Sequence, residues 1–521
     1  MYKRLKKNKR SHQQTGMLAS ELNQPLSANL EENTELFRAL FGDKSDLVVR
    51  PVHSKGLLRA AVIYLDTLID NALIDEFVIK ELQIQLDRLA SEGYVLPLNA
   101  DKFDLFTHQM QIISTLGDAI QCLLRGNSLV LLDSHVEAIC AGTGGGERRS
   151  VSEPTNESVV RGPRESFNET LQTNIGLVRR RLNTHRLRIE KLQIGKLSNT
   201  PVAVLHIEGV AQQAIVEEVL NRLHQIEIDG ILESLYIEEM IEDSKSYTPF
   251  PTIFNTERPD RIAAGLLEGR IAILLEGTPI GLLVPSTLGM FLYSNEDYYE
   301  RYDIASFLKI LRSFTFIMSI VMPGFYVAVL TYHQEMIPTP LLIALTGQRE
   351  GVPFGIAIEV ALMEITFEIL REAGIRLPKT IGSAVSIVGG LVLGQAAVEA
   401  GLVGAGTVIA VSITAIASFC TPSYNLAIAA RLLRFFVLAL TAMLGAFGLF
   451  FGLILIIIHL NSLRSFSVPF LSPVAPFHRK GWKDLFVRFP WWAMKQRPEE
   501  IAGANNSRMP SNKPQQGGGK R

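Results

Sequence analysis

A series of long apolar stretches in the second half of the chain constrains its fold most strongly. After Tyr302 they run from Leu311 to Tyr332, Pro353 to Ala373, Ile381 to Gly401, Gly404 to Ala427 and Phe435 to His459. An α-helix needs about 20 mostly apolar residues to cross about 30 Å of hydrocarbon. The sequence therefore predicts a multi-pass α-helical membrane domain over residues 303–465.

A sixth apolar stretch, Ile271 to Tyr293, is interrupted by Glu276, Gly277 and Pro279. These residues suit a strand and a turn of a soluble domain, but the stretch is also long enough for an imperfect membrane span. The pattern leaves both alternatives open.

The two ends of the chain are basic, which bears on the number of crossings. Basic tails suit nucleic acid, but beside a membrane domain they favour the cytoplasmic face and anionic lipid. We therefore expect lipid and no nucleic acid as a partner, and both termini in the cytoplasm. Five spans conflict with that placement, so four or six crossings are predicted. The basic residues are Lys3, Arg4, Lys6, Lys7, Lys9 and Arg10 in front, and Arg479, Lys480, Lys483, Arg488, Lys495 and Arg497 behind.

The first half has the composition of a soluble domain. Over the whole chain, 47% hydrophobic and 20% charged residues fit a soluble part joined to a membrane part. The start of the chain lacks the apolar run of a signal peptide, so this half is expected in the cytoplasm. We predict a disordered basic tail (1–34), a first α/β subdomain (35–140), a linker (141–152), a second α/β subdomain (153–302) and a basic cytoplasmic C-terminal tail (466–521).

Local patterns support an α/β fold for both subdomains. The segments DLVVR, SLVLLD, TPVAVLHIEGV and GRIAILLEGTP are typical of buried strands. QQAIVEEVLNRLHQI has a helical pattern, and AAVIYLDTLIDNALIDEFVIKELQIQL has the length of a helix. The fold class predicted is a cytoplasmic α/β N-terminal domain of two subdomains, followed by the helical membrane domain.

The chain shows no motif of a catalytic, nucleotide or metal site, so we predict no enzyme activity and no cofactor. Its three cysteines, Cys122, Cys140 and Cys420, have no short paired spacing and are expected to be reduced thiols. A basic run, Arg179 to Arg181, suits either phosphate or, with Glu165, Glu169 and Glu190 nearby, a network of ion pairs.

Four glutamates lie in the apolar segment from Pro353 to Pro378. Pro353 suits a first helical turn, Gly374 suits a helix end and Pro378 prevents continuation. On a helix, Glu364, Glu368 and Glu372 lie within about 80° of one another, and Glu359 lies roughly opposite Glu368. One face cannot hide all four carboxylates from lipid.

The four carboxylates divide by depth. Glu368 with Arg371, and Glu372 with Arg376, have the spacing of ion pairs near the headgroups. Glu359 and Glu364 lie deeper and need a bundle interior, a water path or a cation. Two alternatives remain: an amphipathic helix with its charges in water, or a helix whose copies surround a cation pore. Glu359 and Glu364 are the candidate pore-facing or cavity-facing residues.

Two further features concern helix packing. Gly382, Ser386, Gly390 and Gly394 form a stripe of small residues that favours close helix contact. Pro323 is a candidate hinge, although a proline kink without function is equally common.

Several long segments of the chain are distinctive: EPTNESVVRGPRESFNETLQTNIGLVRRRL, PFPTIFNTERPDRIAAGLLEGRIAILLEGTP, NEDYYERY, REAGIRLPKTIGSAVSIVGGLVLGQAAVEAGLV and SFSVPFLSPVAPF. In this order they closely resemble the A subunits of the GerA family of spore germinant receptors, and the resemblance extends from about residue 36 to 498. A local departure is GGGERRSVSEP, where the family often has a tryptophan.

The resemblance implies a multi-pass protein of the spore inner membrane. It implies partnership with B-type and C-type receptor subunits, a homo-oligomer and the release of monovalent cations as germination begins. Three functions are therefore considered: a subunit that forms or gates a cation channel, a non-conducting scaffold that relays the signal, and, less favoured for lack of an inverted repeat, a secondary transporter.

Overall fold

The computed structural model describes residues 23–42, 45–53, 59–91, 109–145, 153–154, 157, 159–243, 248–378, 390, 392–478, 481–502 and 506–509. Most of the expected tail 1–34 and of the linker 141–152 lies outside these residues. The chain forms two compact units. We call them the α/β unit (Met1–Glu242, Asn255–Pro285 and Met494–Arg521) and the helical unit (Asp243–Phe254 and Ser286–Ala493).

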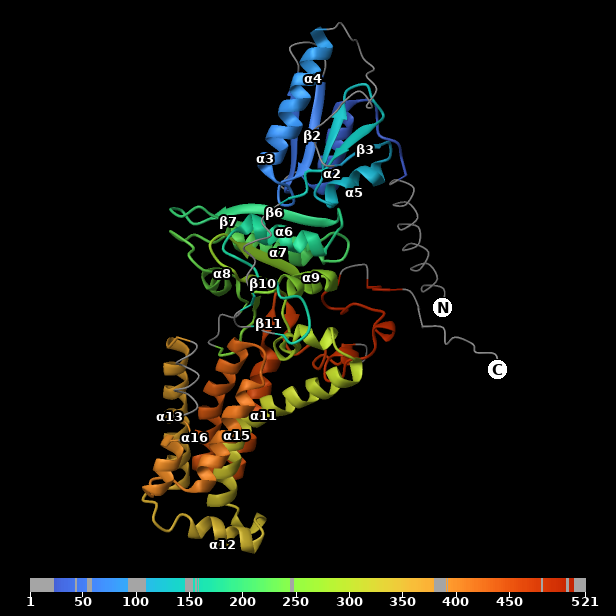
Figure 1. Cartoon of the computed structure of the whole chain (residues 1–521). Helices are drawn as coiled ribbons and strands as arrows, with labels where there is room; N and C mark the ends of the chain where they lie inside the picture. Colours follow the sequence, from blue (N-terminus) through green and yellow to red (C-terminus); the bar gives the residue numbers. More distant parts are fainter. Residues whose placement is uncertain are drawn as a thin grey trace, which may run out of the picture. The chain divides into compact units, whose positions relative to one another are not determined.

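The first subdomain of the α/β unit is an antiparallel sheet with helices on both faces (Figure 1). Its strand order is β1-β2-β4-β5-β3. Its elements are α2 (Leu30–Phe41), β1 (Leu47–His53), β2 (Arg59–Leu65), α3 (Asn71–Leu73), the π-helix η1 (Ile74–Ile79), α4 (Lys80–Ser91), β3 (Met110–Ile113), α5 (Leu116–Leu124), β4 (Ser128–Leu132) and β5 (Ala138–Ala141).

Strand β2 shows why this sheet needs helices on both faces. Alternate side chains of a strand point to opposite faces. Ala61, Ile63 and Leu65 join one buried cluster, with residues of α2 and α5. The alternate residues Ala60, Val62 and Tyr64 join a second cluster, with residues of η1 and α4. The strand is therefore apolar and buried from Ala60 to Leu65.

The segment predicted to be one long helix from Ala60 onward is therefore partly wrong. It is a strand as far as Leu65, and α3 begins only at Asn71. The side chain of Asp70 accepts hydrogen bonds from the backbone of Ala72 and Leu73, which starts the helix. A strand covered on both faces lacks the alternation of polar and apolar residues that distinguishes a strand from a helix in the sequence. Its apolar run was therefore read as part of the helix that follows.

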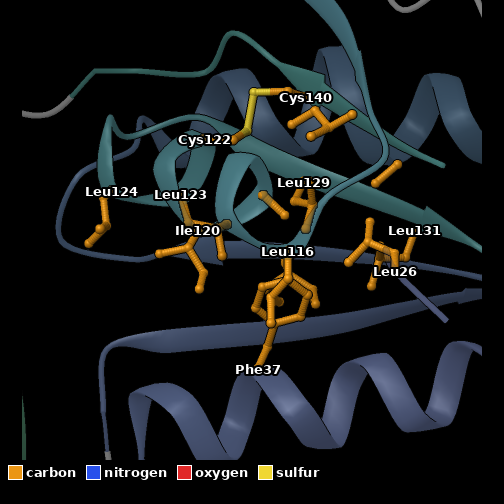
Figure 2. Packing of buried hydrophobic residues seen from close by; sticks show 14 of the residues in the cluster. Leu26, Phe37, Leu116, Ile120, Cys122, Leu123, Leu124, Leu129, Leu131 and Cys140 are labelled. Atoms are coloured by element: carbon orange, nitrogen blue, oxygen red, sulfur yellow. A yellow bond between two sulfur atoms is a disulfide. The ribbon is translucent and has the colours of Figure 1, made fainter. Parts of the chain in front are cut away.

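The prediction of reduced cysteines is wrong for two of the three. Cys122 on α5 and Cys140 on β5 form a disulfide within the first buried cluster (Figure 2), with their Cα atoms 6.1 Å apart. Their separation of 18 residues gives no sequence signal. The packing of α5 on the sheet brings them together. Cys420 is free.

The second subdomain has the strand order β6-β7-β9-β10-β8. The uncertain stretch 271–293 forms the hairpin of β9 and β10 and the short helix α10, not one continuous helix. The elements are α6 (Leu171–Arg181), β6 (Leu187–Ile194), β7 (Thr200–Ile207), α7 (Gln213–His224), α8 (Ser234–Ile241), β8 (Phe254–Thr256), α9 (Pro259–Glu268), β9 (Ile271–Leu275), β10 (Gly281–Val284) and α10 (Leu288–Leu292).

The two subdomains repeat the same topology. If β6 to β10 are numbered from one, their order is that of the first sheet, and a helix precedes the first strand and the fourth strand in both. Asn33 and Asn174 are each the fourth residue of the opening helix, and both are buried. Each amide side chain makes two hydrogen bonds to the backbone of the residue six positions earlier. This repeat was not predicted.

A buried ion pair joins the two subdomains within the α/β unit. Both side chains of Arg179 (α6) and Asp46 are fully buried, and Arg179 donates from Nε (2.9 Å) and Nη2 (2.5 Å) to the two oxygens of Asp46. Thr67 donates a further hydrogen bond to Asp46. Arg181 pairs with Glu165 at 2.5 Å, so the ion-pair interpretation of the basic run holds for this residue. Asp46 was not among the partners predicted.

Burial raises the pKa of the Glu238 carboxyl group in the second subdomain. Desolvation, supported by the charges of Glu233 and Glu242, raises the pKa of Glu238 on α8 from 4.5 to about 7, against the opposing hydrogen bonds of Asn255 and Ser234. The unfolded chain loses this proton near pH 4.5 and the folded chain only near pH 7. The stability of the α/β unit should therefore fall as the pH rises through this window.

We predict that Glu238→Gln removes this pH-dependent loss of stability. The difference between the two pKa values corresponds to a loss of about 3 kcal/mol in the free energy of unfolding at and above pH 7. The variant should match the wild type near pH 4.5 and exceed its stability at pH 8. Hydrogen–deuterium exchange of the α8 amides, measured across this range, checks the result. Equal pH profiles for the two proteins would contradict it.

The expected C-terminal tail, 466–521, is folded where the structure describes it. Residues up to Ala493 belong to the helical unit, and Met494 onward belongs to the α/β unit. There, Gln212 donates hydrogen bonds to the backbone of Glu500 and Ala502, and Arg508 pairs with Glu268 at 3.1 Å. The composition of a basic tail did not reveal these contacts.

The helical unit contains the apolar stretches. Its secondary structure begins with α10, before the boundary expected at 302, because α10 and the short 3-10 helix η3 pack on α11. Its remaining elements are η3 (Asn295–Tyr298), α11 (Tyr302–Thr331), η4 (Gln334–Met336), α12 (Thr339–Gly347), α13 (Ile356–Arg376), α15 (Ala405–Phe419), α16 (Tyr424–Ser462), β11 (Arg464–Ser465), β12 (Val468–Pro469), η5 (Gly481–Asp484) and η6 (Trp491–Ala493).

Two of the helices in the described part of the chain, α11 and α16, are long and apolar enough to cross a membrane, and α15 is shorter. The expected span 404–427 is divided, because α15 ends at Phe419 and α16 begins at Tyr424. About half of the expected span 381–401 lies outside the described residues, and its described end is helical over residues 392–399.

Helix α16 consists of two arms that meet at Gly445. Gly445 has φ 62° and ψ −143°, a conformation outside the helical region. A Cβ placed on Gly452 would lie only 3.8 Å from the Cα of Val437. In a straight helix these residues would be about 22 Å apart. The chain therefore reverses at Gly445, and the expected span 435–459 is interrupted by a tight turn.

We predict that Gly445→Ala destabilises the helical unit by about 2 kcal/mol, because a side chain is strained at this φ and ψ. Its Cβ would also lie 2.8 Å from Cγ of Tyr332. The midpoint of thermal unfolding in detergent, followed by tryptophan fluorescence, measures the effect. Gly347→Ala is the matched control, since a Cβ there meets nothing within 4 Å. Equal midpoints for the two variants would contradict the prediction.

Candidate functional site

The candidate site is the set of charged side chains that α13 places inside the helical unit. Gly355 is the N-cap of α13, so Pro353 lies before the helix and not in its first turn. The helix continues beyond Gly374 to Arg376. Glu359 and Glu364 are 0% and 1% exposed. They carry charge into a packed apolar environment, which requires a partner for each.

Glu359 has a complete set of partners. Its Oε1 accepts hydrogen bonds from Nε (3.0 Å) and Nη2 (2.5 Å) of Arg349. Its Oε2 accepts from the backbone nitrogen of Gly404 (3.0 Å) and the hydroxyl of Thr407 (2.9 Å). Gly404 is the N-cap of α15. A carboxylate at a helix N-terminus is favoured by the helix dipole, so Glu359 fixes the start of α15 against α13.

Glu364 has an incomplete set of partners. Its Oε2 accepts a short hydrogen bond from Nη1 of Arg434 on α16. Among the described residues, Oε1 of Glu364 and Nε and Nη2 of Arg434 are buried without a hydrogen-bond partner. Buried polar atoms without partners are costly, so this pair is suited to hold a water molecule or an ion.

Glu368 continues the charged contact between α13 and α16. It accepts a hydrogen bond of 2.8 Å from Arg431 on α16 and lies 3.7 Å from Arg371 on its own helix. Because Glu364 pairs with Arg434 and Glu368 with Arg431, α13 runs antiparallel to the first arm of α16. Arg371 also donates to the hydroxyl of Ser418 on α15 at 2.8 Å. Together, the hydrogen bonds of Glu368 and Arg371 connect α13 to both α15 and α16.

The outer pair is exposed. Glu372 and Arg376 lie 2.6 Å apart, with side chains 59% and 77% exposed. An exposed pair of this kind contributes little to stability. Its placement near lipid headgroups, like that of Glu368 with Arg371, stays a prediction.

The partners of the deeper glutamates were not predicted from the sequence. Arg349 lies after α12, and Arg431 and Arg434 lie on α16, far from α13 in the sequence. A signal was present in the spacing: Glu364 and Glu368 are four residues apart, and Arg431 and Arg434 are three apart, so each pair lies on one side of its helix.

The packing residues are partly described. Gly382 and Ser386 lie outside the described residues. A Cβ on Gly390 would lie 3.8 Å from Phe367 on α13, and one on Gly394 would lie 3.4 Å from Val408 on α15. Pro323 is buried inside α11. Whether it acts as a hinge stays a prediction.

Comparison with known proteins identifies the family. Residues 35–500 match the family described as Bacillus/Clostridium GerA spore germination protein. The chain belongs to the GerA family. This confirms the resemblance found in the sequence, which covers nearly the same residues.

Similar proteins match over most of their length. The chain is 44% identical to Spore germination protein KA of Bacillus subtilis (strain 168) over 493 residues, which cover 93% of this chain and 89% of that protein. It is 40% identical over 491 residues to Uncharacterized membrane protein YfkQ of the same organism, covering 94% of this chain and 95% of that protein.

A solved structure is also similar to part of the chain. The crystal structure of the N-terminal domain of the A subunit of the Bacillus megaterium spore germinant receptor GerK3 is 32% identical and covers 51% of this chain and 98% of that chain, with a TM-score of 0.40.

Proposed function

We propose that this chain is an A-type subunit of a nutrient germinant receptor, placed in the spore inner membrane, and that it converts nutrient sensing into germination without a catalytic step. The observation that carries the proposal is the family match over residues 35–500, together with relatives named spore germination proteins. B-type and C-type receptor subunits are its proposed partners. A homo-oligomer is its proposed assembly.

We further propose six membrane crossings. They are α11, α13, the stretch 381–401, α15 and the two arms of α16. The turn at Gly445 adds the crossing that a count of five spans lacked. Six crossings place both basic ends and the Arg371–Arg376 end of α13 on the cytoplasmic side, as the distribution of basic residues favours. A membrane-impermeant label that reaches a cysteine introduced at either end from the outer side would exclude this topology.

The channel mechanism is proposed from the pair of Glu364 and Arg434. Its three buried polar atoms without described partners are the feature of α13 best suited to a wet or ion-containing path. The predicted pore role is therefore placed on Glu364. Glu359, whose four hydrogen bonds are made within the chain, is proposed to position α15 beside that path.

The test is cation flux through the purified protein in vesicles. The wild type should release trapped potassium, and Glu364→Gln should change the rate or the selectivity between monovalent cations. Glu372→Gln, at the exposed outer pair, is the matched control and should conduct like the wild type. Each variant is compared after elution as the same oligomer as the wild type, so that misfolding is recognised. Equal flux in all three would remove Glu364 from the path.

The alternative is a non-conducting scaffold that relays the signal to other membrane proteins. The joined subdomains of the α/β unit favour it, because the buried pair of Arg179 and Asp46 gives that unit a rigid connection for transmitting movement. The scaffold predicts no potassium flux in the wild type, and loss of germination in spores when this pair is replaced.

A further inference from the structure

The first three turns of α11 have an exposed apolar face and an opposite face that makes polar contacts. The helix has 30 residues and a length of about 45 Å, more than the hydrocarbon core of a bilayer requires. Over residues 304–314, five apolar side chains lie within about 120° of one another. They are between 41% and 66% exposed, and they are Ile304, Phe307, Ile310, Leu311 and Phe314.

The opposite face of these turns is fixed by polar contacts to the C-terminal segment 481–493, which lies in the same unit. Lys309, fully buried, donates from Nζ to Oδ1 (2.7 Å) and to the backbone oxygen (3.0 Å) of Asp484. Its ammonium also lies 4.0 Å from the ring centroid of Tyr293. Ser306 accepts a hydrogen bond from the backbone nitrogen of Arg488 and donates one to its oxygen. The apolar face is thereby held outward.

The C-terminal segment presents a second group of apolar side chains. Rings of this group contact one another, as Trp482 does with Phe486 at 5.7 Å between centroids. Two exposed cations accompany these segments. Lys483 lies in the C-terminal segment, and Arg301, which pairs with Asp303 at 3.0 Å, is the N-cap of α11. The exposed apolar residues are Trp482, Phe486, Val487, Phe489, Trp491 and Trp492.

We propose that residues 304–314 and 481–493 together form an interfacial platform that lies in the headgroup region of a phospholipid bilayer. Three observations select lipid as the occupant. The apolar face is continuous with the spanning part of the same helix. Indole rings prefer the boundary between headgroups and hydrocarbon. The adjacent arginine and lysine complement anionic phosphate groups. An amphipathic surface of this kind inserts to a depth of about 5–10 Å.

The platform rests on the proposed membrane placement, and it assigns a function to a segment that composition predicted to be a tail. It sets the depth at which α11 enters the bilayer, because Lys309 and Asp484 tie that helix to the segment. A change at this contact would shift the spanning part of α11 along the membrane normal.

The native tryptophans provide the test. The chain has three, and all lie in the segment 481–493. The full-length protein is reconstituted in phospholipid vesicles that carry bromine either near the headgroup end of the acyl chains or near the bilayer centre. The platform predicts a loss of tryptophan emission that is several-fold larger with the shallow bromines. Equal or greater loss with the deep bromines, or no loss at all, would overturn it.

A relocated tryptophan tests the helix face. In the W482F/W491F/W492F background, Phe307→Trp should show the same preference for shallow bromine. Leu235→Trp, exposed in the α/β unit, is the control and should show no loss. Removal of the protein from the vesicles by alkaline extraction would contradict the membrane placement itself. If the protein stays inserted but bromine does not quench the Phe307→Trp variant, the result would contradict the platform alone.

Discussion

Replacing Arg434 with methionine is expected to destabilise the helical unit by about 3–5 kcal/mol, because the substitution leaves the buried carboxylate of Glu364 without its cation. Glu364 is 1% exposed, and its only described partner is Arg434. The midpoint of unfolding in detergent, followed by tryptophan fluorescence, is the appropriate measurement. All three tryptophans lie in the same unit, so the signal reports that unit directly.

Two further variants separate charge from packing. Arg376→Met removes the cation of an exposed pair and should change the midpoint little. The double variant E364L/R434L removes both charges and should recover most of the loss, because apolar groups of similar volume often replace a buried ion pair without cost. A double variant less stable than R434M would contradict the explanation and indicate that the charges hold the helices in register.

Replacing Arg179 with methionine is expected to have a similar effect on the α/β unit. Asp46 would stay fully buried with only the hydroxyl of Thr67 as a side-chain partner, at a cost of about 3–5 kcal/mol. Hydrogen–deuterium exchange is the suitable measurement, since this unit has no tryptophan. The amides of β1 and α6 should exchange faster by about two to four orders of magnitude.

Arg181→Met is the matched control for that prediction. Arg181 lies two residues away and pairs with Glu165, whose side chain is 54% exposed. Removing this pair should cost no more than about 1 kcal/mol and leave exchange in β1 unchanged. If both variants changed exchange equally, the effect would come from the charge of α6 and not from the junction between subdomains.

Much of the fold of the α/β unit was predictable from the sequence, because its strands are short apolar runs. SLVLLD and TPVAVLHIEGV became β4 and β7 as expected. The repeated topology was not predictable in this way. The opening helices share the buried asparagine at their fourth position, with leucine at the first and seventh positions and arginine at the ninth. Four matching residues are too short a repeat to indicate a duplicated fold without the matching hydrogen bonds.

In the helical unit, hydropathy predicted the helices but not the breaks within them. Apolar length located α11 and α13, but one residue, Gly445, divides α16, and its effect depends on a backbone conformation that hydropathy does not report. The candidate site was also only partly predictable from the sequence. The glutamates of α13 were recognisable as groups that need partners, whereas the choice of Arg349 and Arg434 depends on contacts across helices.

The disulfide between Cys122 and Cys140 gives the natural chain one unique attachment point for a thiol-reactive reporter. The sequence has three cysteines, so Cys420 is its single free thiol. Cys420 is the C-cap of α15, beside Phe419, whose ring lies under the guanidinium of Arg371. A spin label or fluorophore placed there requires no substitution. In the proposed homo-oligomer, label-to-label distances would report how far apart the ends of α15 lie in neighbouring copies.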